Sequence, residues 1–509
     1  MDLFGTAGIR GSATDRVTPA LALAVGGAVG SAARERADAR GGGDGGDDEG
    51  NGSDDEGNGS DDEGNATDSV PEVVVARDGR VTGPTLAAAM ESGLASAGAK
   101  VLRAGVLPTP ALAYASQGRH GVMITASHNP PHDNGIKLFH DGTEFERELE
   151  ELVERRVAAE PEPAAWDEWT ESATIDVLEQ YREAVAEYAR DYGAPLEGLR
   201  IAVDCGNGMA SVATPQVLRK LGAEVVTLNA NVDGHFPGRG SKPTPETLTD
   251  LREFVADANE RAETDSPGRG GDEGFAFGIG HDGDADRIVV VDADGEIVHE
   301  DTVLTILAEQ YVRASDAADP VVVTTPNASG RIDERVREAG GRVERVRLGA
   351  LHEGIAAVEE GEAGDATDDG TAGRVAFAAE PWKHVHTAFG GWIDGVCSAA
   401  VVARLVAAEG LDGLRAPVTE RPYRKVSVDC PDDRKAAAMA ELETALPAAF
   451  PEAEVSTEHG VRLEFPDASW LLVRPSGTEP YIRLYAESDD VDALIEDARE
   501  VIADAVAEA

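Results

Sequence analysis

The chain has 509 residues, of which 41% are hydrophobic and 28% charged, and its 96 acidic residues outnumber its 45 basic ones. Such a length exceeds what one hydrophobic core organises, and it predicts three or four domains that can enclose a ligand between them. The formal net charge of −51 argues against nucleic acid as a partner, because binding it relies on Lys and Arg to neutralise phosphates.

The acidic excess and the cysteines indicate the surroundings in which the chain works. Repulsion among the acidic side chains opposes a compact state in dilute salt. At about 1 M salt this repulsion is screened beyond roughly 3 Å. We therefore expect a halophile's cytosol, with a merely acidic and very soluble enzyme as the alternative. Cys205, Cys397 and Cys430 are few and far apart, which argues against a disulfide framework or a zinc cluster. Residues 1–10 lack a signal-peptide core and no run reaches the roughly 18 apolar residues of a membrane helix, so we expect a cytoplasmic protein without a membrane partner.

Three acidic, glycine-rich segments interrupt the pattern of the chain. Residues 41–69 repeat Asp-Asp-Glu-Gly-Asn-Gly-Ser, which offers no apolar side chain to bury, so we predict a disordered acidic insert. Two weaker segments, 259–274 and 361–373, are expected to be expanded surface loops. None of the three is expected to carry chemistry.

Between these segments, short runs rich in β-branched residues alternate with longer Ala, Leu and Glu stretches of helical period. This alternation predicts βαβ units and a mixed or largely parallel sheet, hence an α/β fold class. Near the end of the chain, closely spaced strands precede one helix, which predicts an α+β domain. The predicted strands are 73–76, 100–104, 122–125, 201–203, 224–228, 288–292, 321–325, 461–465, 470–473 and 482–486, and the predicted helices are 84–97, 213–221, 331–339 and 491–507.

Changes in composition mark three candidate domain boundaries, near 160–164, 294–301 and 414–422. They divide the chain into four predicted domains. These domains are 1–160, 165–296, 297–415 and 420–509.

The first chemical motif follows the predicted strand 122–125. Thr125 to Lys137 reads TASHNPPHDNGIK, so Ser127 presents a hydroxyl at a strand end in a loop rich in Pro, Asn and Gly. Sheet proteins commonly present reactive groups at such places. Taken alone, a serine in a turn is more often structural, and the hydrolase pattern Gly-x-Ser-x-Gly does not fit here.

The second motif, His281 to Arg287, precedes the predicted strand 288–292 and reads HDGDADR. Its three aspartates at alternate positions can converge on one hard cation and leave room for water and a phosphate oxygen. A helix-loop-helix calcium loop would need Gly at its sixth and Glu at its twelfth position, where this chain has Arg287 and Ala293. An arginine beside metal ligands fits a metal whose other partner is a phosphate.

The third motif, Arg474 to Pro480, reads RPSGTEP and is followed by Arg483. Hydroxyls, turn amides and arginine donors suit a phosphate that is held but not attacked. A plain polar turn is the alternative if this motif stands alone. The chain does not contain the phosphate loop of nucleotide hydrolases, and Gly206-Asn207-Gly208 lacks the third glycine of a dinucleotide turn.

Together these motifs resemble the α-D-phosphohexomutase superfamily from end to end. Residues 3–11, LFGTAGIRG, are similar to its opening motif, and the three loops above are similar to its phosphoserine, metal and phosphate loops. The resemblance implies three similar mixed-sheet α/β domains and a smaller C-terminal α+β domain around a central cleft. In chain order these would carry the phosphoserine, the metal, the sugar-recognition residues and the phosphate site.

The resemblance also implies a mechanism, that of a mutase moving a phosphoryl group between sugar hydroxyls through a sugar bisphosphate. Ser127 would be phosphorylated, and Mg²⁺ would be held by Ser127, Asp282, Asp284 and Asp286. Lys137, Arg287 and Arg10 would add positive potential, His128 would polarise the transfer, and one of His128, Lys137 or His352 would be the general acid/base. The distal phosphate would be anchored by Arg474, Ser476, Gly477, Thr478 and Arg483, and the bisphosphate would serve as activator.

The sugar loop is where the chain departs from the pattern of the hexose-using members, Gly-Glu-x-Ser-Gly. Here residues 378–384 read AAEPWKH, so Glu380 is kept and Trp382 replaces the serine. With Lys383, His384 and His352, Glu380 is expected to bind substrate, while Trp382 either narrows the pocket for a pentose or stacks on a hexose ring. This loop resembles an archaeal branch with phosphopentomutase-like members, so we prefer pentose phosphate over hexose or glucosamine phosphate. A metal-dependent phosphatase and a non-catalytic phosphosugar-binding protein are the alternatives from other classes.

Overall fold

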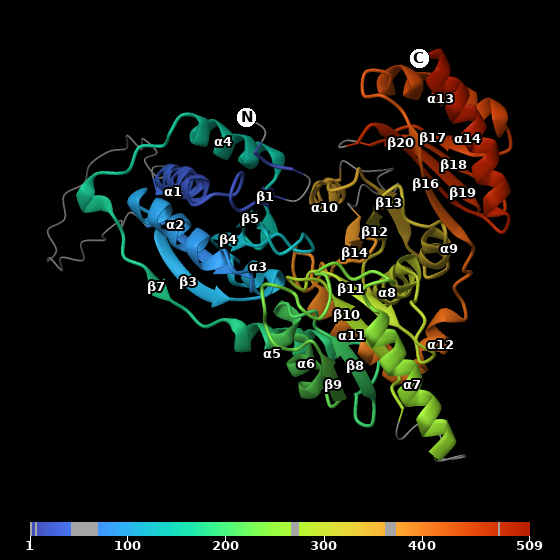
Figure 1. Cartoon of the computed structure of the whole chain (residues 1–509), viewed down its shortest axis with the longest axis horizontal. Helices are drawn as coiled ribbons and strands as arrows, with labels where there is room; N and C mark the ends of the chain where they lie inside the picture. The colour runs from blue at the N-terminus through green and yellow to red at the C-terminus, as the bar shows by residue number, and fades with distance from the viewer. Residues whose placement is uncertain (1–2, 6–7, 42–69, 266–273, 362–372, 477–478) are drawn as a thin grey trace, which may run out of the picture.

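The computed structural model describes residues 3–5, 8–41, 70–265, 274–361, 373–476 and 479–509, arranged around four β-sheets (Figure 1). Most of the predicted acidic insert, residues 42–69, lies outside the described residues, as do 266–273 and 362–372 of the two weaker segments. Among the described residues, no helix is both long enough and apolar enough to cross a membrane.

The first sheet has three parallel strands at its centre. They are β2 (Glu72–Arg77), β3 (Lys100–Val106) and β4 (His120–Ile124). The run Val73-Val74-Val75 is buried on both faces of β2, as expected of a central parallel strand rich in β-branched residues. Antiparallel strands extend one edge: β5 (Asp133–His140) pairs with β4, and β1 (Ile9–Ser12) and β6 (Thr143–Glu144) pair with β5. β7 (Ala173–Thr174) closes the other edge beside β3.

The second and third sheets repeat the central pattern of the first, three parallel strands and then one antiparallel strand at the edge. The second comprises β9 (Glu224–Leu228), β8 (Arg200–Asp204), β10 (Phe277–His281) and β11 (Ile288–Val291) in spatial order. The third comprises β13 (Arg342–Arg345), β12 (Pro320–Thr324), β14 (Arg374–Glu380) and β15 (Lys383–Val385). The predicted fold class of three similar mixed-sheet α/β units is therefore confirmed.

This repetition places the motifs at equivalent positions. In each sheet the third parallel strand turns into the antiparallel edge strand, through residues 125–132 after β4, 282–287 after β10 and 381–382 after β14. The serine, metal and sugar motifs occupy these three connections. Parallel strands end at one edge of a sheet, where α/β proteins gather their ligand-binding loops.

The fourth sheet is antiparallel, with the order β16 (Tyr423–Asp429), β20 (Tyr481–Glu487), β19 (Trp470–Pro475), β18 (Val461–Glu464) and β17 (Glu454–Ser456). The predicted α+β unit is confirmed, with α13 (Lys435–Ala449) and α14 (Val491–Glu508) packed on the sheet. It joins the third unit through a buried ion pair in which Arg331 Nη2 lies 2.6 Å from Glu487 Oε1.

Helices cover the first three sheets. They are α1 (Pro19–Gly41), α2 (Gly83–Ser96), α3 (Thr109–Ala115), α4 (Arg147–Ala158), α5 (Leu178–Ala189), α6 (Thr214–Lys220), α7 (Thr249–Asp265), α8 (Glu300–Ala314), α9 (Arg331–Glu338), α10 (Leu351–Glu359), α11 (Gly395–Glu409) and α12 (Leu411–Arg415), with short 3₁₀ turns at Trp166–Glu168 and Met209–Val212. α7 continues to Asp265, so the prediction of a loop from residue 259 is wrong for residues 259–265. α1 likewise runs through Gly41, the first residue of the predicted disordered insert.

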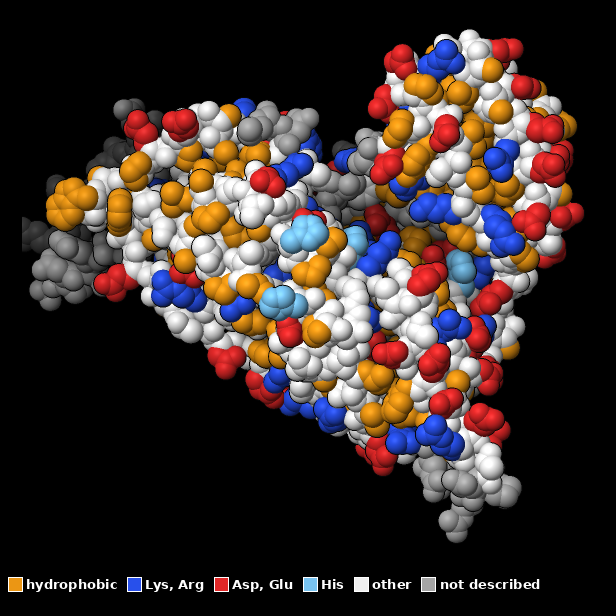
Figure 2. Space-filling view, viewed as in Figure 1, with side chains coloured by type: hydrophobic (Ala, Val, Ile, Leu, Met, Phe, Trp, Pro, Cys, Tyr) orange, Lys and Arg blue, Asp and Glu red, His pale blue; other side chains and the backbone are white. Residues whose placement is uncertain are grey.

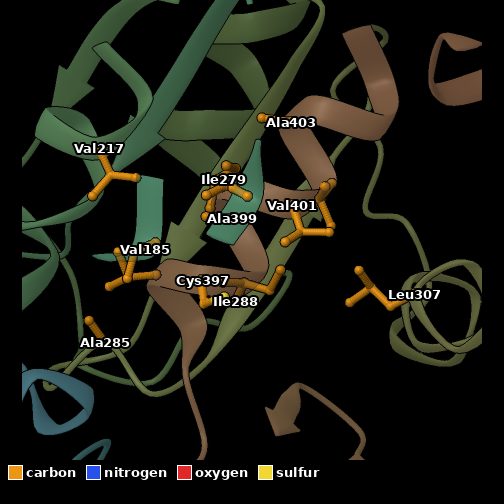
Figure 3. Close-up of a cluster of buried hydrophobic side chains, with 14 of the residues drawn as sticks. Val185, Val217, Ile279, Ala285, Ile288, Leu307, Cys397, Ala399, Val401 and Ala403 are labelled. Carbon is orange, nitrogen blue, oxygen red and sulfur yellow. The ribbon is translucent and has the colours of Figure 1, made fainter. Parts of the chain in front are cut away.

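The largest hydrophobic core joins the first three units, with most of its residues in the second and third. Cys397, Ala399, Val401 and Ala403 of α11 pack among the strand residues Ile279 and Ile288 and the helix residues Val185 and Val217 (Figure 3). α11 belongs to the predicted range 297–415 but contacts α5 and α6 of the second unit. Because β7 extends the first sheet to Thr174, beyond the predicted boundary at 160, the four residue ranges stay predictions, and that boundary does not match the sheet.

Candidate active site

Ser127 lies in the connection that follows β4, and its side chain reaches the second unit. Its Oγ donates a hydrogen bond to Asp282 Oδ2 at 2.7 Å, between residues 155 positions apart in the sequence. The Ser127 amide donates to Thr125 Oγ1 at 2.9 Å. The backbone at Ser127 has φ 51°, a left-handed conformation that is uncommon for residues other than glycine and is typical of functional sites.

A glycine allows this close approach of the serine and metal loops. A Cβ atom at Gly283 would lie 2.6 Å from the Ser127 carbonyl oxygen, which is closer than two non-bonded heavy atoms approach. Any side chain at residue 283 would therefore push the two loops apart. The glycine in the pattern Asp-Gly-Asp-Ala-Asp thus has a steric role that the sequence did not reveal.

Asp282, Asp284 and Asp286 converge as predicted. Each is buried, and one carboxylate oxygen from each lies within 4.8 Å of those of the others. Asp284 Oδ1 and Asp286 Oδ1 are buried and have no hydrogen-bond partner among the described residues. Burial, followed by the charges of Asp286 and Asp284, raises the pKa of Asp282 well above its usual value. Buried carboxylate oxygens that repel one another and lack donors fit a divalent cation with oxygen ligands.

Two cationic side chains, Lys137 and Arg287, lie against the triad. Lys137 Nζ donates to Asp286 Oδ2 at 2.8 Å and lies 3.6 Å from Asp284 Oδ2. Burial lowers the pKa of Lys137, but Asp286, Asp284 and Glu144 outweigh this effect and raise it overall. Arg287 Nε lies 3.6 Å from Asp286 Oδ1. Lys137 therefore stays protonated at neutral pH, which suits a fixed positive charge better than a general base.

His128 is adjacent to the serine hydroxyl. Its Nδ1 lies 3.2 Å from Ser127 Oγ. Burial, followed by the positive charges of Arg287 and Arg10, lowers the pKa of His128 to about 2. The imidazole is therefore neutral and placed to hydrogen-bond with the hydroxyl, and the negative charge of a phosphoryl group on Ser127 would raise its basicity.

A narrow cavity opens beside this cluster. It brings together predicted residues from three of the four units: Arg10, Lys137, Arg287, His352, Glu380 and Lys383. Glu144, Gly349 and His352 also line a larger adjoining cavity. In the space-filling view a hollow separates the lobe of the first sheet from that of the fourth (Figure 2). This arrangement agrees with the expected central cleft.

The sugar motif contributes a fixed carboxylate and ammonium to the cavity. Lys383 Nζ donates to Glu380 Oε2 at 3.1 Å, and the Gly349 amide donates to Glu380 Oε1 at 2.7 Å. His352 Nε2 donates to the Gly391 carbonyl oxygen at 2.7 Å, which leaves Nδ1 as the ring atom that can accept a proton.

The structure does not bring His384 or Trp382 into this cavity. Successive residues of a strand face opposite sides, so His384 on β15 points away from the side on which Lys383 lies. His384 is buried, with Nδ1 3.0 Å from Ser398 Oγ, and its prediction as a substrate ligand does not fit this geometry. Trp382 packs on a hydrophobic cluster of the second unit, so neither predicted role, narrowing the pocket or stacking on a sugar ring, fits its position.

The phosphate motif lies in the turn between β19 and β20. Arg474 and Arg483 face each other across these strands, and each has a buried Nε without a hydrogen-bond partner among the described residues. Ser476 Oγ is likewise buried and without such a partner. Gly477 and Thr478 lie outside the described residues. Unused donors grouped at a turn fit an anion.

Sequence reasoning missed Arg80, which holds the serine loop. All five guanidinium N–H groups are used: Nε donates to Asp78 Oδ2, and the two Nη atoms donate to four carbonyl oxygens. These carbonyls belong to Ser127, Asn129, Pro130 and Asp133. Asp78 also accepts from Thr125 Oγ1 at 2.7 Å, which completes the support of the loop.

We expect Arg80→Lys to disorder the serine loop although it keeps the charge. An ammonium group has three donors and cannot reproduce the planar fork, so buried carbonyls lose partners at a cost of roughly 1–3 kcal/mol each before relaxation. Turnover should fall at least about tenfold, and the melting temperature should drop. Arg77→Lys is the matched control, because Arg77 is a half-buried neighbour whose guanidinium donates to the Asp78 carbonyl oxygen at 3.0 Å. Equal melting temperatures and rates for the two variants would contradict the role of Arg80.

Thr109, at the start of α3, is a second residue that sequence reasoning missed. Its Oγ1 donates to Asp284 Oδ2 at 2.6 Å, and its amide donates to the Asp284 carbonyl oxygen at 3.0 Å. The two residues are 175 positions apart. Thr109 therefore gives the metal loop a second attachment to the first unit, at Asp284, besides that of Ser127 at Asp282.

The fold and the site are those of an enzyme that transfers phosphoryl groups. Comparison with known proteins identifies its family. Models of the phosphoglucomutase/phosphomannomutase family match residues 63–164 (alpha/beta/alpha domain I), 179–295 (alpha/beta/alpha domain II) and 426–505 (C-terminal domain). A solved structure from Burkholderia thailandensis, described as a phosphoglucomutase/phosphomannomutase family protein, is 25% identical and superposes with a TM-score of 0.76. That match covers 98% of this chain and 97% of the other.

Two archaeal relatives match over nearly their full lengths. A protein of Thermococcus kodakarensis named "Phosphopentomutase" is 37% identical, and one of Methanopyrus kandleri named "Probable phosphoglucosamine mutase" is 38% identical. Each match covers 96% of this chain and 94% of the relative. The chain belongs to the phosphoglucomutase/phosphomannomutase family within the α-D-phosphohexomutase superfamily, and it is a phosphosugar mutase.

Proposed function

We propose that this mutase carries the transferred phosphoryl group on Ser127 and acts on a pentose phosphate. The observation that supports the first part is the 2.7 Å hydrogen bond from Ser127 Oγ to Asp282. It brings the reactive hydroxyl, the acidic triad and the cationic side chains of the cavity to one place. Ser127 is the one residue that we predicted to carry the phosphoryl group.

Mg²⁺ is the cation that we assign to the triad. Asp282, Asp284 and Asp286 would hold it, with a phosphoryl oxygen on Ser127 as a further ligand, and when bound it would draw negative charge from the transferring group. Lys137 and Arg287 contribute positive charge on the other side of the carboxylates.

The transfer consists of two exchanges of a phosphoryl group between Ser127 and the sugar. In the first, the bond from phosphorus to Ser127 Oγ breaks and a bond forms to the free sugar hydroxyl oxygen. The hydroxyl proton passes to a base, Ser127 Oγ takes up a proton, and a sugar bisphosphate results. In the second, the other phosphoryl group moves to Ser127 Oγ, and its former sugar oxygen is protonated. His128, near Ser127 Oγ, and His352, in the cavity, are placed to carry these protons.

The bisphosphate must be held at either end while it turns over. Arg474, Ser476 and Arg483 offer donors that are not used within the described residues, and they are the anchor that we propose for the distal phosphate. A phosphatase that gives its phosphoryl group to water has no need of such an anchor. The bisphosphate would also restore phosphoserine when it is lost, and so act as activator.

Charge in the cavity supports a pentose phosphate over an amino sugar. Arg10, Lys137, Arg287 and Lys383 all line it. Each of its three acidic residues has a lysine partner: Asp286 and Glu144 lie 2.8 and 3.6 Å from Lys137 Nζ, and Glu380 is paired with Lys383. A substrate ammonium group would meet repulsion there. Trp382 also leaves no hydroxyl where the resemblance places a serine, so fewer sugar hydroxyls can be bound. A glucosamine phosphate is the second candidate, because of the relative from Methanopyrus kandleri.

Turnover of a substrate panel tests this proposal. We expect ribose 5-phosphate to give a kcat/KM at least about tenfold above those of glucose, mannose and glucosamine 6-phosphates, with less than stoichiometric release of inorganic phosphate. Both the sugar 1-phosphate and free phosphate should be measured, the latter to detect a phosphatase. A preference for glucosamine 6-phosphate would contradict the substrate, and sustained phosphate release would contradict the mutase mechanism. The halophilic and cytoplasmic setting stays a prediction from composition.

A further inference from the structure

The turn that carries Glu380 and Lys383 has an unusual residue at its second position. β14 and β15 pair at Glu380 and Lys383, so Pro381 and Trp382 form a two-residue turn. Proline first and a residue with positive φ second is the arrangement of a type II turn, in which the second position favours glycine. Here it is Trp382, with φ 69°. A bulky residue in this conformation persists where the surrounding structure holds it.

The indole of Trp382 is held by a different unit of the protein. It packs against the hydrophobic cluster of the second sheet that includes Val289 and Val291 of β11. It also lies beside Ile288 and Val290 of β11, in a shallow apolar surface depression that is separate from the substrate cavity. The turn of the third unit is therefore attached to the strand that directly follows the metal loop.

A backbone contact lies beside this attachment. Lys383 forms an isolated antiparallel bridge with Arg287, the last residue of the metal motif. Arg287, Glu380 and Lys383 all line the substrate cavity. The position of Trp382 thus affects the distance between the metal loop and the side chains of Glu380 and Lys383, which face the substrate cavity.

We infer that Trp382 is a positioning residue, which fixes Glu380 and Lys383 at a set distance from the metal loop and so limits the size of sugar that fits between them. The inference rests on the proposed function of this cavity. It assigns Trp382 a role in specificity without contact with substrate. The strained backbone is maintained because the indole is packed across the boundary between the units.

Three substitutions separate the packing from the strain. Trp382→Gly removes the ring and also the energetic cost of the positive φ. Trp382→Ala removes the ring but keeps that cost, and Trp382→Phe keeps an aromatic ring. We expect the Gly variant to melt no lower than the Ala variant. We expect both to raise KM for ribose 5-phosphate on the order of 10- to 100-fold, with a smaller change in kcat. The Phe variant should stay near the wild type.

Sugar selectivity gives a readout that a purely structural role would not move, and hydrogen exchange tests the attachment of the turn to the second unit. The ratio of kcat/KM for hexose over pentose phosphates should rise in the Gly variant, and amide exchange should accelerate at 380–383 but not in β10. Trp166→Ala, at a side chain 85% exposed, is the matched control and should change neither. An unchanged ratio and unchanged exchange in the Gly variant would overturn the inference. A wild type that turns over no sugar phosphate would instead overturn the proposed function, and the exchange result would still test the attachment.

Discussion

Ser127→Ala is expected to abolish mutase turnover, by a factor on the order of 10⁴ or more, while the protein stays folded. The variant loses the only atom that the proposal uses to carry the phosphoryl group, and the remaining residues can bind but not exchange it. Its stability should change by about 1 kcal/mol, the usual net contribution of one hydrogen bond such as that to Asp282. Steady-state turnover and thermal melting measure the two effects.

Ser116→Ala is the matched control for this variant. Ser116 is also fully buried in the first unit, and its Oγ donates to the Ala113 carbonyl oxygen at 2.8 Å. We expect it to cost comparable stability and to leave turnover within about twofold of the wild type. Full turnover by Ser127→Ala would remove the serine from the mechanism.

Asp282→Asn should separate stability from activity. The pKa of Asp282 is raised by burial and by repulsion from Asp286 and Asp284, so the amide relieves an unfavourable charge in the metal-free protein. We expect the metal-free variant to be more stable than the metal-free wild type by roughly 0.5–2 kcal/mol. Turnover should fall at least about 100-fold, because a metal ligand is lost. Mg²⁺ should stabilise the wild type and no longer stabilise the variant.

Asp394→Asn is the control, and we expect it to lower the stability of the protein where Asp282→Asn raises it. This buried carboxylate accepts hydrogen bonds from the Tyr181 hydroxyl, Trp392 Nε1 and the Cys397 amide. An amide keeps only one acceptor oxygen, so this variant should be less stable than the wild type by roughly 1–3 kcal/mol. If Asp282→Asn destabilised the metal-free protein as much as Asp394→Asn does, the triad would not be a repulsive cluster built for a cation.

The sequence was sufficient for many of the strands, for a few of the helices and for the centre of the site. Strands such as β2 and β8 are β-branched runs buried on both faces, so their pattern does not depend on distant residues. Ser127 and the triad lie in short motifs whose order along the chain is informative. Ser127 Oγ lies 2.7 Å from Asp282 Oδ2, and the two motifs occupy equivalent connections in sheets of the same pattern.

The residues that the sequence did not reveal act through tertiary contacts. Arg80 and Thr109 resemble ordinary loop residues, and their partners lie about 50 and 175 positions away. Trp382 was placed in the pocket because a sequence does not show which unit a turn residue packs against. The boundary at 160 stays a prediction, and the sequence did not show that β7, two residues long, returns to the first sheet beyond it by pairing with β3.

The fate of a radiolabelled phosphoryl group on Ser127 tests the central claim most directly. Protein carrying that label is mixed with an excess of unlabelled ribose 5-phosphate, and the label is followed in protein, sugar and inorganic phosphate during one turnover. We expect label to leave the protein for the sugar, in sugar bisphosphate and monophosphate, at the rate of catalysis. Label that stays on the protein while turnover proceeds, or that emerges as inorganic phosphate, would contradict it.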